Sequence, residues 1–166
     1  RSPRSTVGTI TEVYDFLRLL FARAADAYSY NTGKKMVSYT DRQIRDLIAS
    51  DYGGRRISIL APVIKSRKGH YRELFEQIAK QGFVKVRVDG EIRDLEKGMK
   101  VDRYKTHDIE IVIDRMQVGP EEETLKRLDE SIRTAMYAGD DVLMVLEAGS
   151  DNPRYFSRDL LCPETG

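Results

Sequence analysis

The stretch Phe83-Val84-Lys85-Val86-Arg87-Val88-Asp89-Gly90 decides the fold, because it describes a strand that runs into a tight turn. Its valines alternate with charged residues, which is the period of a strand with one buried and one solvated face. An Asp-Gly pair at the end of such a run is a strong hairpin signal. We expect a three-residue loop with Gly90 left-handed, since this places Ile92 opposite Val88. A two-residue turn would instead place Ile92 opposite Arg87, on the solvated face.

Helices and further strands flank this hairpin. The apolar run 57–64 predicts a buried strand, and Pro62, which has no N–H to donate, belongs at an edge, a bulge or the end of that strand. Thr40 and Gln43 form a capping box that begins a helix. Further strands are expected at 36–39, 109–118, 142–146 and 155–156, and further helices at 9–24, 71–81 and 121–138. The pattern predicts an α/β protein of the mixed α+β type, with a mixed sheet and about four helices.

Length and composition limit the class of protein. A chain of 166 residues forms one domain, or one domain and pieces of a second, and we expect it to be cut from a longer protein. The single cysteine, Cys162, fits a reducing compartment, so we expect a cytoplasmic location. There is no apolar run of membrane-spanning length and no signal-peptide pattern, so we expect no membrane contact. The net charge of +1 hides a basic segment, 55–72, and an acidic one, 137–151; these are either partner-facing or simply solvated.

The motifs of common enzymes are missing. No glycine-rich phosphate loop with its lysine is present, so we expect no nucleotide site. His70 and His107 lie in separate polar segments without metal-ligand spacing, and Cys162 is alone where zinc needs about four ligands. We therefore expect no catalytic residue, metal or cofactor in this chain.

Long blocks of the sequence resemble one family. Residues 1–23 begin Arg-Ser-Pro-Arg-Ser-Thr-Val-Gly-Thr and continue into an apolar helix pattern that Thr9 and Glu12 can cap. This stretch closely resembles a segment of the UvrA family, which belongs to the ABC excinuclease of DNA repair. The blocks 59–64, 67–69, 80–91 and 107–115 also resemble that family, in the same order.

The resemblance implies a domain organisation and a role. Residues 1–25 would be a helix of the first signature domain, 26–150 the inserted UvrB-binding domain, and 151–166 the return segment. The parent protein would be a dimeric ABC-type ATPase that uses ATP and Mg²⁺, inspects DNA in nucleotide excision repair and recruits UvrB. The final Cys-Pro-Glu-Thr-Gly resembles a zinc knuckle whose second cysteine is replaced by Thr165, so Cys162 would be the remnant of a zinc site.

The resemblance also implies contact residues for UvrB. Carried over by motif, these are Lys85, where the family commonly has arginine, and Arg115; Arg87 shares the expected solvated face with Lys85. Lysine keeps the charge but lacks the planar fork of arginine. The alternative is that these are ordinary solvated residues, with Arg115 paired internally to Asp114 or Glu110.

A second function is direct contact with DNA through the basic segment 65–72. Its cations are Lys65, Arg67, Lys68 and Arg72, with Tyr71 nearby. Phosphate binding by such residues is strongly salt-dependent. The near-neutral net charge and the lack of an aromatic platform in the sequence pattern argue against strong independent binding.

Overall fold

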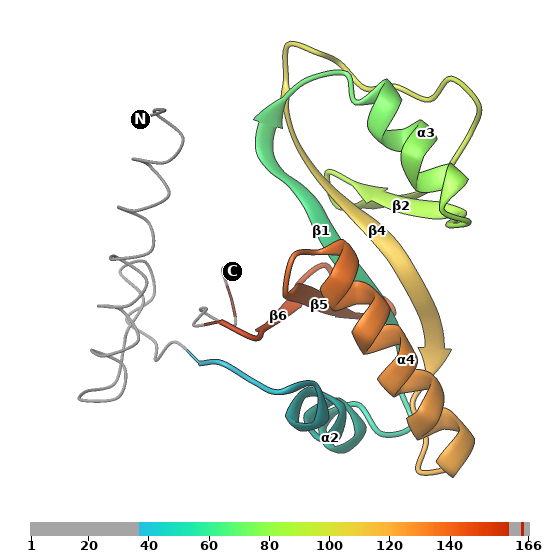
Figure 1. Cartoon of the computed structure of the whole chain (residues 1–166), viewed down its shortest axis with the longest axis vertical. Helices are drawn as coiled ribbons and strands as arrows, with labels where there is room; N and C mark the ends of the chain where they lie inside the picture. Colours follow the sequence, from blue (N-terminus) through green and yellow to red (C-terminus); the bar gives the residue numbers. More distant parts are fainter. Residues whose placement is uncertain (1–36, 160–163, 165–166) are drawn as a thin grey trace, which may run out of the picture.

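A computed structural model describes residues 37–159 and Glu164. These residues form a six-stranded sheet. Helices pack against it (Figure 1). Its helices are α2 (Asp41–Asp51), α3 (Arg72–Lys80) and α4 (Glu122–Ala138). Its strands are β1 (Arg56–Lys68), β2 (Lys85–Val88), β3 (Glu91–Asp94), β4 (Thr106–Gln117), β5 (Val142–Glu147) and β6 (Arg154–Ser157). The α+β class is confirmed. Three helices are seen in the described part, and the expected helix at 9–24 lies outside it, as does Cys162.

The strand order is β3-β2-β4-β1-β5-β6, and every neighbouring pair is antiparallel. The mixed sheet that we expected is therefore wrong for the described strands. Helix α3 connects β1 to β2, and α4 connects β4 to β5, but each crossover skips one strand. The skipped position is filled by an antiparallel strand, so that parallel strands never become neighbours.

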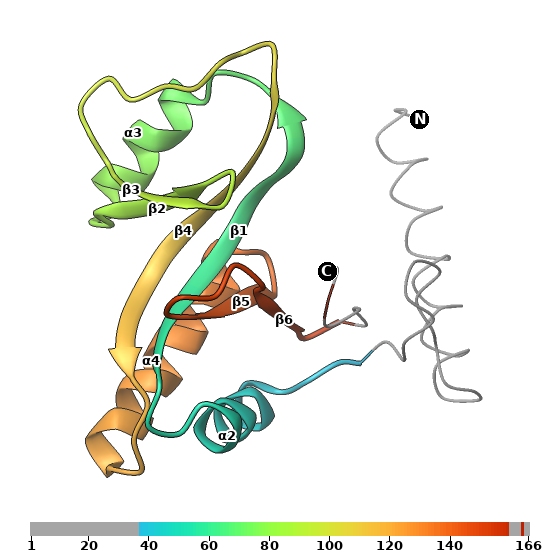
Figure 2. The same ribbon diagram turned by 180° about the vertical axis from the view of Figure 1, so that it is seen from behind.

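All three helices pack on one face of the sheet. The larger apolar cluster joins Ile48 of α2, Phe75 of α3 and Ile132 of α4 to strand residues such as Val86. Figure 2, seen from behind, shows the strands in front of α4. A smaller cluster on the other face consists only of strand residues, namely Leu60, Val112, Met144 and Leu146 with Ile92 and Tyr155 against them. Both faces of the sheet therefore hold apolar side chains.

Local signals set the element ends. The Thr40 hydroxyl accepts from the Gln43 N–H at 3.2 Å, and the Gln43 side chain accepts from the Thr40 N–H at 2.9 Å, which confirms the predicted capping box. Of the three positions expected for Pro62, the structure shows the bulge, since the register of β1 against β4 shifts just after it. Pro62 lies beyond the last residue of β1 that pairs with β5, so its missing N–H costs no ladder bond on that side.

The predicted three-residue hairpin loop is wrong. Val88 pairs with Glu91 and Arg87 with Ile92, so the loop is a two-residue turn. Asp89 and Gly90 both have positive φ, 51° and 87°, as the favoured hairpin turn requires. The prediction failed because it assumed a solvated second face, whereas Ile92 packs there against the smaller cluster.

The expected domain limits at 25 and 150 stay predictions. In the described part, β6 pairs with β5 beyond residue 150 and so belongs to this sheet. The backbone N–H of Tyr39 donates to the carbonyl of Ser157 at 2.9 Å. The two ends of the described segment 37–159 therefore lie side by side.

Candidate functional site

The sheet face opposite the helices carries the residues that the resemblance implicates in binding. Val86 is buried in the helix-covered core, so its neighbours Lys85 and Arg87 lie on the other face. Arg115 pairs with Ser58 of β1, and Ser58 pairs with a residue of β5 that belongs to the smaller cluster. Side chains of directly paired residues lie on the same face of a sheet. Lys85, Arg87 and Arg115 thus share one face, which we call the open face.

A bulge in β4 places Arg115 on this face. Val112 pairs with Leu60, but Asp114 pairs with the adjacent Ile59, so Ile113 is an extra residue. The extra residue reverses the alternation of side chains along the strand. Asp114 consequently points to the helices and Arg115 away from them.

Asp114 does not pair with the side chain of Arg115. Its carboxylate accepts hydrogen bonds from Arg127 of α4, at 2.6 and 2.8 Å, and from the Ser131 hydroxyl at 2.8 Å. Burial by itself raises the pKa of Asp114, but these hydrogen bonds and the charge of Arg127 outweigh it and hold the pKa below its usual value. Within residues 37–159, Arg115 is exposed and its guanidinium has no ion-pair partner.

Lys85 is already engaged inside the domain. Its ammonium group forms an ion pair with Asp94, the residue directly opposite it on β3. The Lys85 side chain is 34% exposed and that of Asp94 is 70% exposed. Asp94 was not predicted as a partner of Lys85, although a two-residue turn after Val88 would have placed positions 85 and 94 opposite each other.

Arg87 is not at the surface, which corrects the solvated-face position that we expected. Its Nη1 donates to Glu110 Oε1 at 2.6 Å, and both side chains are at least nine-tenths buried. Burial raises the pKa of Glu110, although the Arg87 partner opposes the shift. In the described part of the chain Arg87 Nε has no hydrogen-bond partner. Arg87 is therefore engaged by Glu110 within the sheet, and its role as a partner contact stays a prediction.

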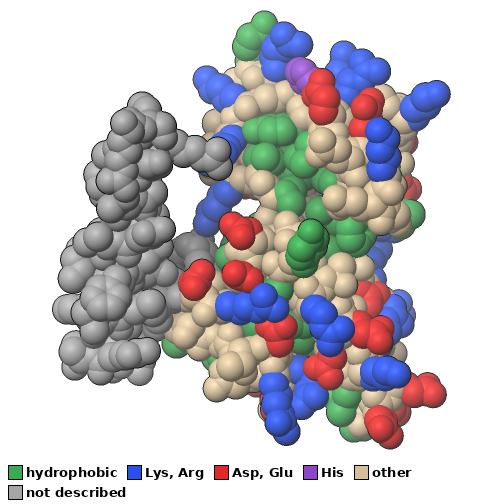
Figure 3. Space-filling model, viewed as in Figure 1, with side chains coloured by type: hydrophobic (Ala, Val, Ile, Leu, Met, Phe, Trp, Pro, Cys, Tyr) green, Lys and Arg blue, Asp and Glu red, His purple; other side chains and the backbone are tan. Residues whose placement is uncertain are grey.

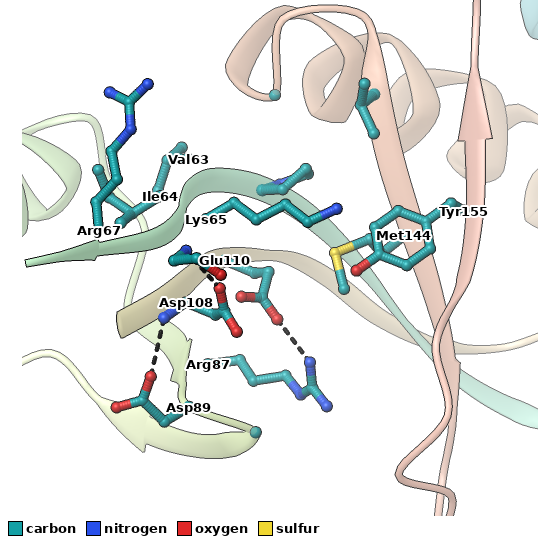
Figure 4. A pocket seen from close by; sticks show the side chains of 15 residues that line it. Val63, Ile64, Lys65, Arg67, Arg87, Asp89, Asp108, Glu110, Met144 and Tyr155 are labelled. Atoms are coloured by element: carbon teal, nitrogen blue, oxygen red, sulfur yellow. Dashed lines mark hydrogen bonds and ion pairs between the residues drawn. The ribbon is translucent and has the colours of Figure 1, made fainter. Parts of the chain in front are cut away.

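A cavity of about 640 Å³ opens above this buried pair (Figure 4). Arg87 and Glu110 lie on one side of it, and the Lys65 ammonium lies 5.4 Å from the centre of the Tyr155 ring. Its lining contains both cations and carboxylates, such as Asp108. This balanced lining favours neither an anionic nor a cationic ligand.

The basic segment 65–72 is not one loop. Lys65, Arg67 and Lys68 continue β1, with Arg67 paired to His107 and Lys68 to Thr106 of β4. Arg72 instead begins α3, and its Nε lies 3.5 Å from Oε1 of Glu76, which is one helical turn further along. Of the four cations, Arg67 and Lys68 lie closest to the end of the strand.

The histidines and acids of the described ranges do not form a cluster of the kind that holds a metal ion. No cluster of three or more His, Cys, Asp or Glu side chains suited to a metal ion occurs in residues 37–159. His107 is buried between Asp89 and a backbone carbonyl, and His70 Nδ1 accepts from the Arg72 N–H at 3.1 Å. No described helix has the length and apolar character to cross a membrane.

Comparison with known proteins identifies the family. The model of the family described as "UvrA interaction domain" matches residues 40–149, which is the sheet and its three helices without β6. The chain belongs to this family. The resemblance to UvrA drawn from the sequence is thereby confirmed.

Full-length relatives of this UvrA interaction domain carry the name UvrABC system protein A. The chain is 46% identical to the one from Methanothermobacter thermautotrophicus over 99% of its length, 40% identical to that of Thermus thermophilus over 99%, and 40% identical to that of Bacillus subtilis over 100%. In each case the chain spans only 17% of the relative's length.

Proposed function

We propose that this UvrA interaction domain docks the repair protein UvrB through its open face, with Arg115 as the principal contact. The observation that carries the proposal is that Arg115 is exposed and has no ion-pair partner among the described residues. The neighbouring carboxylate, Asp114, is already hydrogen-bonded to Arg127. A free guanidinium binds a carboxylate through two parallel hydrogen bonds. The partner should therefore present an acidic side chain here.

Lys85 is the second contact in this proposal. Continuing the register of β2 against β4 places Lys85 beside Val112, three residues from Arg115 along β4. At a strand rise of roughly 3.3 Å per residue, the two side chains lie about 10 Å apart on the same face. This spacing suits two acidic side chains on one partner segment, and Arg87, being buried, takes no direct part.

The relatives' name supports a proposal for the role of the domain within a longer protein. We place it in a UvrA-type protein of nucleotide excision repair, in which this domain supplies recruitment and other parts supply ATP hydrolysis. The ATP and Mg²⁺ sites, any zinc site, DNA inspection and dimer formation belong in this proposal to those other parts. The isolated chain is accordingly expected to have no ATPase activity.

Titration calorimetry of the 166-residue chain against UvrB from the same source tests the docking role. The Arg115→Glu substitution should abolish measurable binding, because truncating or reversing one partner of a desolvated charge pair costs about 2–5 kcal/mol. Arg133→Glu is the matched control, since Arg133 is also exposed but lies on α4. Circular dichroism of both variants shows whether the fold is intact.

The expected result is loss of binding for Arg115→Glu and near-normal binding for Arg133→Glu. Unchanged affinity in a correctly folded Arg115→Glu variant would contradict the proposal. Equal losses in both variants would point to a general effect of charge and would also contradict a specific contact at Arg115.

A further inference from the structure

Two segments that are distant in sequence bring cations together at one end of the sheet. Arg67 and Lys68 lie at the end of β1, paired with the first residues of β4. The turn that precedes β4 is closed by a hydrogen bond from the Lys105 N–H to the Asp102 carbonyl, and it also carries Arg103. We call Arg67, Lys68, Arg103, Tyr104 and Lys105 the distal basic surface.

The positive charge of this surface is not neutralised internally. Arg67, Lys68, Arg103 and Lys105 are all exposed, and none has an ion-pair partner within residues 37–159. Figure 3 shows Lys and Arg side chains gathered at the top of the molecule, the end where β1 passes into α3 in Figure 1.

The acidic side chains near this end are already engaged by other groups. Asp89 Oδ2 lies 2.7 Å from the ring of His107, and Asp108 Oδ1 accepts the N–H of Ser66 at 2.8 Å. Asp102 Oδ1 accepts the N–H of Tyr104 at 2.9 Å. None of these three carboxylates forms an ion pair with the four exposed cations, so the cations are available to an external anion.

An exposed aromatic ring lies among these cations. Tyr104 is 79% exposed, which is unusual for so large a side chain, and it stands between Arg103 and Lys105. Its backbone is held by Asp102, so the position of the residue is defined by the turn. Cations that follow a phosphate backbone, combined with an aromatic ring on which a base can stack, are the usual elements of a single-strand nucleic-acid surface.

We propose that the distal basic surface binds single-stranded nucleic acid, with the four cations on phosphates and Tyr104 stacked on an unpaired base. An acidic peptide would also use the cations, but the exposed ring favours a ligand with a flat aromatic group. The surface is separate from the open-face contact at Arg115, which lies ten residues beyond Lys105 in the chain, or roughly 30 Å at the rise of a strand. Both surfaces can therefore be occupied at once, and the proposal does not depend on UvrB docking.

Fluorescence anisotropy with a labelled oligothymidine of about 20 nucleotides tests this proposal, at salt concentrations from roughly 50 to 300 mM. The unmodified 166-residue chain should bind at low salt and release as salt increases. The double variant R103A/K105A should reduce the slope of log K against log salt by about 1.4, since each phosphate contact on a single strand contributes about 0.7. The control double variant, K80A/K126A, removes two exposed lysines from α3 and α4 and should leave the slope unchanged.

The stacking role has its own matched pair of variants. Tyr104→Ala should weaken binding about fivefold or more without changing the salt slope, because the ring adds stacking and no charge. Tyr137→Ala removes a tyrosine that is even more exposed but lies on α4, and it should have no effect.

Three results would overturn the proposal: no binding at low salt, equal losses for Tyr104→Ala and Tyr137→Ala, or displacement of the oligonucleotide by polyglutamate at equal charge concentration. The last would identify the surface as a site for acidic polypeptides.

Discussion

His107 Nδ1 lies 2.7 Å from Asp89 Oδ2, which ties the first residues of β4 to the β2–β3 turn. The other ring nitrogen, Nε2, lies 2.6 Å from the carbonyl oxygen of Asp102. Since both neighbours can only accept, the arrangement needs a proton on each nitrogen, and so a charged imidazolium. The Asp89 hydrogen bond is the main reason that the pKa of His107 is raised, with the Asp102 carbonyl adding to it.

This buried cation should make stability depend on pH. Because the pKa of His107 is higher in the folded than in the unfolded chain, its contribution is complete below the ordinary value of 6.5 and is lost as pH rises through the folded value. We expect the difference in unfolding free energy between the unmodified chain and His107→Gln to shrink as pH rises above about 6.5, through the raised pKa of the folded chain. Urea unfolding at several pH values measures it, and a difference that stays constant with pH would show that the ring is neutral.

Arg87 and Glu110 form a buried ion pair on the open face, and removing one partner should be costly. Arg87→Ala leaves an unpaired buried carboxylate and should lower the unfolding free energy by about 3–5 kcal/mol. The double variant Arg87→Met with Glu110→Leu removes both charges and should recover most of this loss. Denaturant unfolding compares the variants; a double variant no more stable than Arg87→Ala would argue that packing, and not the charge, is responsible.

Asp94 competes with any partner for Lys85, because it already holds the ammonium group. If Lys85 contacts an acid of UvrB, Asp94→Asn should increase the affinity by about two- to fivefold, the range expected for one exposed ion pair. Glu91→Gln removes the same charge from the same strand and serves as the control. The gain should disappear when Lys85 is also changed to Ala. A weaker complex with Asp94→Asn would mean that Asp94 orients Lys85 for binding.

Local sequence signals predict most elements because their causes are local. The Thr40–Gln43 capping box, the bulge at Pro62 and the alternation of Val86 and Val88 depend on residues a few positions apart. The family resemblance in the sequence also points to Arg115 as a candidate contact residue. Its function as a contact remains a prediction.

Two of the predictions that failed depended on the far side of the sheet, and a third, the mixed sheet, depended on which strands become neighbours. The hairpin loop and the position of Arg87 were both mispredicted because the pattern of one strand does not show that a second face is buried.

The sequence by itself determined the class of the fold, the family and the chemistry of the individual side chains, since these depend on residue identity and short-range spacing. The tertiary structure alone decided which charges are free. Asp114 is held by Arg127, Arg87 by Glu110 and Lys85 by Asp94, through contacts that pair residues 9 to 23 positions apart and leave Arg115 exposed. It also brought the turn that carries Tyr104 to the same end of the sheet as Arg67 and Lys68, because antiparallel pairing of β1 and β4 joins one end of each strand.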